Sequence, residues 1–128
     1  MNFPKDLKYT ENDEWVRVDG DVGTIGITDF AQDQLSDVVF VEYLVFEGDV
    51  VDQGDPCTTV ESVKAAADVY TPVSGEIVAV NEDLADSPEM VNSDPYGEAW
   101  MFKVKLDDPS ELDDLLDAEE AENMERDH

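Results

Sequence analysis

The stretch TVESVKAAADVYTPVSGEI, residues 59–77, holds a single lysine, Lys64, between Val63 and three alanines. The segments on either side, residues 57–62 and 68–73, are rich in Val, Thr and Tyr, which favour strands. This pattern predicts a β-hairpin with Lys64 at its tip. The small neighbouring residues leave the lysine side chain accessible to another protein.

Outward from this hairpin, short strand-like segments continue along the chain. Residues 13–28 alternate around Gly20 and predict a second hairpin. Residues 28–37 predict a short helix, capped by Thr28, with Phe30 and Leu35 facing inward. Further strands are expected at 38–46, 74–81 and 99–106, the first of them buried, and one helical turn at 87–92 with Ser87 as its cap.

The C-terminal segment predicts a helix over about residues 109–121, followed by an acidic tail. Pro109 suits a first helical turn, and Ser110 with Asp113 resembles a capping box. Three leucines, at positions 112, 115 and 116, fall on one helical face. Closely spaced short strands with few helices favour a small barrel or sandwich, formed by residues 1–128 as a single domain.

The charge balance is strongly acidic, with 34 Asp and Glu against 7 Lys and Arg and a formal net charge of -27. Nucleic acids and anionic membranes should be repelled by such a surface. The acids are spread along the chain, which predicts a host with a salty cytoplasm that screens their repulsion. One cysteine, Cys57, and no long apolar run favour a cytoplasmic protein.

Residues for catalysis are scarce. The only histidine is the final residue, His128, so a Ser–His or Cys–His pair and a Cys/His zinc site are not expected. No glycine-rich phosphate loop is present. Cys57 is expected to be a small buried residue, and each single carboxylate a solvated surface group. The sequence therefore does not predict an enzyme.

Lys64 is the only Lys or Arg between Arg17 and Lys103. The plainest interpretation is an exposed lysine held by nearby acids such as Glu61 and Asp68. A Schiff-base lysine is disfavoured, because surrounding acids stabilise the ammonium form. Covalent acylation by an outside enzyme is the better hypothesis, since it would turn the lysine into a long tether on a rigid tip.

The segment ESVKAAADVYTPVSGEIVAVN closely resembles the lipoylation segment of the glycine cleavage system H protein family. The resemblance continues through LKYTENDEWVRVDGDVGTIGITDFAQDQLSDVVFVE, LADSPEMVNSDPYGEAWMFKVKL and SELDDLLDAEE. It implies a mainly β, barrel-sandwich hybrid fold of the lipoyl/biotinyl-carrier type, with a short internal helix and a C-terminal helix. It also implies lipoate in amide linkage to Lys64.

The resemblance further implies a carrier without catalysis of its own. In the family, the lipoyl group takes up an aminomethyl group from a pyridoxal-phosphate glycine decarboxylase. The arm then visits a tetrahydrofolate-dependent aminomethyltransferase, and dihydrolipoamide dehydrogenase reoxidises the dithiol. These three enzymes and a lipoylating enzyme are the implied partners of what is expected to be a monomer.

The same resemblance implies roles for individual residues. Glu14 and Asp68 match the carboxylates of the pocket onto which the loaded arm folds back, where they would face a cationic amine. Glu61 matches a glutamate that could help the lipoylating enzyme recognise the tip. Gly75 matches a turn glycine, for which a purely structural role is favoured.

The chain also departs from the family pattern. Asp13 stands where histidine is common, Asn12 where a small hydroxyl residue is common, and Ser36 where glycine is usual. The usual Leu-Pro turn is replaced by YLVFEGD at 43–49, which lengthens an apolar strand and could expose a sticky edge.

Three alternatives remain open. A biotin carrier shares the fold type but resembles Met-Lys-Met at its tip, where this chain has Val63-Lys64-Ala65. A lipoyl domain of a 2-oxo acid dehydrogenase usually has Asp before the lysine and belongs to a longer chain. An unmodified acidic binding module could keep the fold without the arm.

Overall fold

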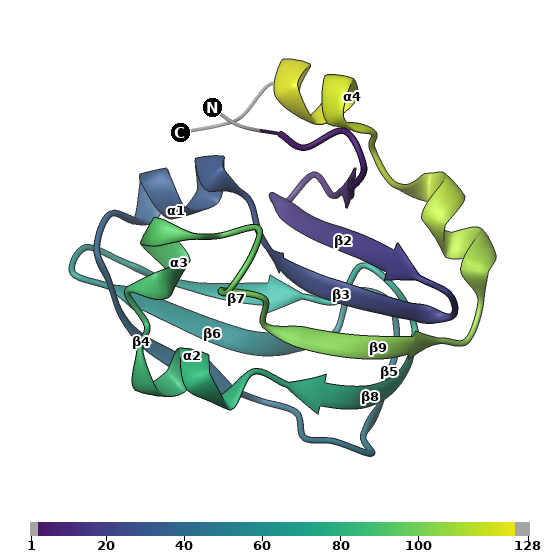
Figure 1. The fold of residues 1–128 in the computed structure, drawn as a ribbon, viewed down its shortest axis with the longest axis horizontal. Coiled ribbons are helices and arrows are strands. Elements are labelled where there is room, and N and C mark those ends of the chain that lie inside the picture. Colours follow the sequence, from purple (N-terminus) through teal and green to yellow (C-terminus); the bar gives the residue numbers. More distant parts are fainter. Residues whose placement is uncertain (1–2, 125–128) are drawn as a thin grey trace.

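Two antiparallel β-sheets face each other in the computed structural model, which describes residues 3–124 (Figure 1). The larger sheet has the strand order β1-β2-β3-β9-β8-β5. Its strands are β1 (Lys8–Tyr9), β2 (Glu14–Asp19), β3 (Val22–Ile27), β9 (Phe102–Leu106), β8 (Gly75–Val80) and β5 (Val50–Val51). The smaller sheet has the order β4-β6-β7, with β4 (Val38–Tyr43), β6 (Pro56–Ser62) and β7 (Ala66–Tyr70).

The core lies between the two sheets. Val16, Ile25 and Ile77 of the larger sheet and Val41 and Val60 of the smaller one belong to the same buried cluster. Each fully buried side chain of this size stabilises the fold by about 1.5–3 kcal/mol relative to an exposed one. The expected mainly β sandwich is therefore confirmed.

The β2–β3 hairpin and helix α1 form where local sequence signals predicted them. The β2–β3 hairpin turns at Gly20, whose φ is 64°. Helix α1 (Asp29–Leu35) begins after Thr28, whose side chain accepts a hydrogen bond from the Ala31 N–H, as predicted. Leu35 is buried and Phe30 is half-buried, so α1 presents an apolar face towards the sheets.

The strand expected at 38–46 is shorter and less buried than predicted. It ends at Tyr43, and only Val38 and Val41 of β4 are fully buried. β4 forms an edge of the smaller sheet, and Val39, Phe40, Leu44 and Phe46 are exposed. The prediction of a buried strand was wrong because a β-bulge between Val38 and Phe40 turns two successive side chains outward.

The C-terminal helix is broken into two pieces. A 3₁₀ helix, η1 (Pro109–Asp114), is capped by Asp108, and α4 (Ala118–Asn123) is capped by a box formed by Asp117 and Glu120. Between them, Leu116 exchanges backbone hydrogen bonds with Tyr9 of β1. One continuous helix over 109–121, with a Ser110–Asp113 box, was therefore wrong, because pairing with β1 interrupts it.

The other short helices lie between β8 and β9. They are α2 (Glu82–Asp86), which the sequence did not predict, and α3 (Met90–Ser93), which begins after Ser87 and Pro88 rather than at them. The acidic tail is described only as far as residue 124, so His128 lies outside the described residues. No helix in the described part of the chain has the length and apolarity needed to cross a bilayer.

Candidate functional site

Lys64 lies at the exposed turn that joins β6 to β7, as the sequence predicted. The turn is closed by Ser62, whose backbone N–H donates to the Ala65 carbonyl at 2.8 Å. The Ser62 Oγ accepts hydrogen bonds from the backbone N–H groups of Lys64 at 3.2 Å and Ala65 at 3.0 Å. These bonds fix the backbone of the hairpin tip, residues 63–65, while the Lys64 side chain stays in solvent.

The hairpin tip is also attached to the segment between α1 and β4. The Val63 N–H donates to the carbonyl of Asp37 at 3.0 Å. This bond anchors the tip to the segment that leads into β4. A group attached to Lys64 would swing from a fixed point.

An apolar pocket of about 460 Å³ lies beside this hairpin. One wall is α1 with the end of β3, one is the residue 11–14 segment, and one is β7 with its neighbour β6. Ala67 is the lining residue nearest to Lys64 in sequence, and three residues of strand span about 10 Å. The lining residues are Glu11, Asn12, Asp13, Glu14, Ile27, Phe30, Ala31, Gln34, Leu35, Val60, Ala67, Asp68 and Val69.

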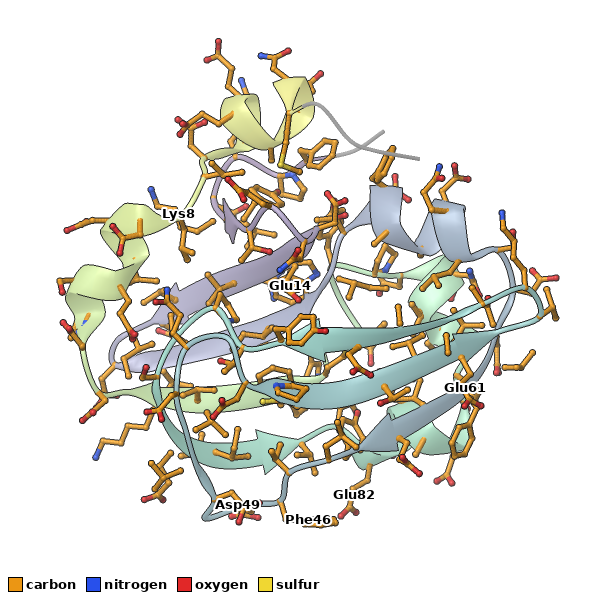
Figure 2. The ribbon with its side chains drawn as sticks, turned by 180° about the vertical axis from the view of Figure 1, so that it is seen from behind. Lys8, Glu14, Phe46, Asp49, Glu61 and Glu82 are labelled. Atoms are coloured by element: carbon orange, nitrogen blue, oxygen red, sulfur yellow. The ribbon has the colours of Figure 1, made fainter. Side chains whose placement is uncertain are left out.

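Glu14 is the buried carboxylate of this pocket, only 2% exposed. Its Oε2 accepts a hydrogen bond from the Tyr70 N–H at 2.7 Å, and its Oε1 accepts one from the Thr10 hydroxyl at 2.8 Å. Glu14 therefore joins β2 of the larger sheet to β7 of the Lys64 hairpin. Figure 2 shows it between these strands. The expectation that a carboxylate in this chain is a solvated surface group fails here.

Burial raises the pKa of Glu14 from 4.5 to about 7. Desolvation is the main cause, and the neighbouring charge of Asp13 raises the pKa further, while the bonds from Tyr70 and Thr10 lower it. Near neutral pH, this carboxyl group is divided between its neutral and charged forms. A cation entering the pocket would favour the charged form.

The raised pKa predicts a specific pH dependence of stability. Between pH 4.5 and about 7 the folded protein binds a proton at Glu14 that the unfolded chain has already released. The free energy of unfolding should therefore fall as pH rises through this window, by about 3 kcal/mol for the shift of two to three pH units. Urea unfolding at constant salt, followed at several pH values, measures the change.

The matched control is Glu14→Gln, which keeps the shape and an oxygen for the Tyr70 N–H but does not titrate. Repulsion among the other acids is common to both proteins and cancels in the comparison. From pH 4 to pH 8 the free energy of unfolding of the Gln variant should rise by about 3 kcal/mol relative to that of the wild type. A constant difference between the two proteins over this range would contradict the prediction.

Asp68 and Glu61 occupy different places on the hairpin. Asp68 is exposed at the pocket's edge, and its Oδ1 accepts a hydrogen bond from the Thr59 hydroxyl at 2.9 Å. Glu61 is exposed on β6, opposite Ala66 of β7 and Phe40 of β4, and does not line the pocket. The structure thus brings Asp68 and Glu14 to one pocket and leaves Glu61 near the hairpin tip.

Three of the four departures from the family pattern, Asn12, Asp13 and Ser36, lie in or next to this pocket, whereas the 43–49 segment does not line it. Asn12 and Asp13 line the pocket, and Asp13 has a positive φ of 63°. Ser36 ends α1 with φ 67° and ψ -147°, a conformation that is costly for any residue but glycine. The usual glycine at this position is thereby explained, and Ser36 carries a local strain of about 1–3 kcal/mol.

Neither the cysteine nor a metal-binding cluster offers a catalytic centre among the described residues. Cys57 is fully buried, and burial raises the pKa of its thiol to about 12, so it is a weak nucleophile. Residues 3–124 hold no cluster of three or more His, Cys, Asp or Glu side chains able to bind a metal ion.

Residues 7–128 match the model of the family described as Glycine cleavage H-protein. The chain belongs to this glycine cleavage H-protein family. A glycine cleavage system H protein from Alteromonas mediterranea is 59% identical over 123 residues, covering 95% of both chains. A probable H protein from Aeropyrum pernix is 57% identical, covering 91% of this chain and 80% of that protein.

The fold of the family is shared as well. The crystal structure of a glycine cleavage system H protein from Mycobacterium marinum superposes with a TM-score of 0.83 at 37% identity, covering 92% of this chain and 94% of that one. Membership of the H-protein family makes the chain a lipoyl-carrier component of glycine cleavage.

Some residues of this H-protein site were missed by sequence reasoning. Ser62 was not singled out, although a serine at the start of a tight turn often bonds to nearby backbone N–H groups. Thr10 was not singled out either, although it lies only four residues before Glu14 and the two flank the tight turn that joins β1 to β2. Ile27 was predicted as a strand residue, but nothing in the sequence indicated that it lines a pocket.

Proposed function

We propose that Lys64 is the attachment point of a lipoyl group and that the protein carries an aminomethyl group between the enzymes of glycine cleavage. The observation that supports this most directly is an exposed lysine on a fixed hairpin tip, beside an apolar pocket that contains carboxylates.

The residues present fit such a group. The Lys64 amine is free to be acylated by an outside enzyme, because the tip is held through backbone atoms and the Ser62 side chain. The lipoyl group, when bound, would supply a disulfide of which one sulfur takes up the aminomethyl group while the other becomes a thiol, and a dithiol would remain once the group has been passed on. Glu61, near the tip, would help the lipoylating enzyme recognise the hairpin.

The pocket would shelter the cargo between enzymes. Phe30, Leu35 and Val60 would exclude water from the arm, and Glu14 and Asp68 would face the protonated amine of the aminomethyl group. A buried carboxyl with a pKa near 7 can become charged when a cation arrives and lose that charge when it leaves. Glu14 would therefore hold the cargo without a permanent buried charge.

The partners follow from the same proposal. A pyridoxal-phosphate glycine decarboxylase would load the carrier, and a tetrahydrofolate-dependent aminomethyltransferase would unload it. Dihydrolipoamide dehydrogenase would return the dithiol to the disulfide. The carrier would act in the cytoplasm as a monomer and would catalyse no step itself.

The intact mass of the protein purified from its own host tests the proposal. We expect an increase of one lipoyl group, located on Lys64 by peptide fragmentation. An unmodified lysine in cells that metabolise glycine would overturn it and favour an unmodified binding module. A biotin-sized increase would instead indicate a biotin carrier.

A further inference from the structure

An exposed apolar surface lies on the side of the Lys64 hairpin sheet opposite to the pocket. β7 is the edge strand beside the pocket, and β4 is the other edge of the same three-stranded sheet. Four large apolar side chains of β4 and the segment after it are exposed, and we call them the β4 patch. They are Val39, Phe40, Leu44 and Phe46.

We propose that the β4 patch docks an enzyme of the glycine cleavage system through an apolar depression ringed by lysines and arginines. This inference rests on the proposed carrier function. It assigns the face that binds the enzyme while the lipoyl group on Lys64 reaches the enzyme's active site. Burial of exposed aromatic side chains is a common source of affinity in protein interfaces.

The patch is presented on a fixed backbone. Phe40 is 45% exposed and stands opposite Glu61 in the β4–β6 pairing. Phe46 is 67% exposed, and its segment is closed by the Asp49 carboxylate, which accepts a hydrogen bond from the Phe46 N–H at 2.8 Å. The same turn is tied to β8, because Ile77 donates its N–H to the Asp49 carbonyl at 2.7 Å. Little ordering would therefore be needed on binding.

The charge around the patch decides the kind of partner. The exposed side chains of Asp37, Glu42, Glu47 and Glu61 lie on or next to the same strand pair, and Figure 2 shows Phe46 at the bottom of the molecule close to Asp49. Lys64 is the only basic residue between Arg17 and Lys103. A second copy would bring two such acidic rims together, whereas a basic rim would be attracted.

The patch is also continuous with the hairpin tip. Val38 pairs with Ser62, the residue that closes the Lys64 turn, and Val63 donates its N–H to the carbonyl of Asp37, just before β4. An enzyme held on β4 would have Lys64 at its border and would leave the pocket at the β7 edge uncovered. The arm could then leave the pocket without the carrier being released.

The test compares Phe40→Thr/Phe46→Ser with the wild type, using the lipoylated full-length carrier. The probes are glycine decarboxylase, the aminomethyltransferase and dihydrolipoamide dehydrogenase of the same host, titrated separately. We expect at least one of them to lose tenfold or more in affinity, with the carrier still folded and lipoylated. Val18→Thr is the matched control, because Val18 is an exposed apolar residue on the other sheet.

A second variant tests the charged rim without removing apolar area. Glu42→Gln/Glu47→Gln should make the affinity for the same enzyme less sensitive to salt, since fewer charges would be screened. Asp49 is left unchanged because it holds the Phe46 turn.

The outcomes separate the two proposals. If the wild type is lipoylated and binds the enzymes but the Phe40/Phe46 variant binds all three within twofold of the control, the docking proposal is overturned and the carrier function stands. A wild-type dimer in light scattering that this variant dissociates would also overturn it, in favour of a second copy. A wild type that binds none of the three would contradict the carrier function itself.

Discussion

Lys64→Arg should abolish carrier activity while leaving the fold intact. A guanidinium stays protonated at all accessible pH values and cannot be acylated as an amine can. The backbone bonds of Lys64 and Ala65 to the Ser62 Oγ do not involve the lysine side chain, so the turn should persist. The exposed position predicts a change in unfolding free energy within about 0.5 kcal/mol.

Two measurements check this prediction. The intact mass of Lys64→Arg should show no lipoyl group, and glycine cleavage reconstituted with the partner enzymes should fall to the rate measured without carrier. Lys103→Arg is the control, because Arg at this position keeps a positive charge above the Trp100 ring and should retain full activity. Turnover supported by Lys64→Arg would show that the cargo travels on another residue.

The hairpin around Lys64 could be predicted from sequence because its signals are local. Strand-forming residues flank a tight turn, and the turn and the first strand appear where expected, while β7 spans Ala66–Tyr70 rather than the expected 68–73. The same holds for the β2–β3 hairpin at Gly20 and for the Thr28 cap of α1. In each, the residues that decide the conformation are neighbours in the chain.

Features that depend on distant pairing could not be predicted. The C-terminal helix is interrupted because Leu116 pairs with Tyr9, which lies more than 100 residues earlier. Glu14 is buried because the fold brings Tyr70, 56 residues further along the chain, to its carboxylate, and its sequence neighbours gave no sign of this. For β4, apolar composition indicated a strand, but only the bulge decides which side chains face solvent.

Gly75→Ala should strongly destabilise the fold. A Cβ at this position would lie 1.9 Å from the Lys105 carbonyl oxygen, which is backbone and cannot rotate away. Gly75 also has a φ of +155°, which side chains rarely allow. To relieve this contact, β8 must separate from β9. Backbone strain, overpacking and the loss of hydrogen bonds between the two strands together should lower the free energy of unfolding by at least about 4 kcal/mol.

The consequence should extend to the Lys64 site through Ser74. Its N–H and Oγ both donate to the Glu111 carboxylate, at 2.7 and 2.8 Å, and its Oγ accepts from the Gln53 N–H. Displacing residue 75 would disturb this junction between β8, η1 and the loop before β6. Lipoylation of the variant should therefore fall along with its stability, although Gly75 touches neither Lys64 nor the pocket.

Gly20→Ala separates the close contact at Gly75 from the general cost of replacing a glycine. Gly20 has a positive φ of +64°, but a Cβ there would meet nothing within 4 Å. Its cost should be only about 1–2 kcal/mol, from the left-handed conformation alone. Urea unfolding of both variants at the same salt concentration measures the difference. A Gly75→Ala loss no larger than that of Gly20→Ala would mean that β8 and β9 can shift apart freely, and that the glycine is not required by its contact with Lys105.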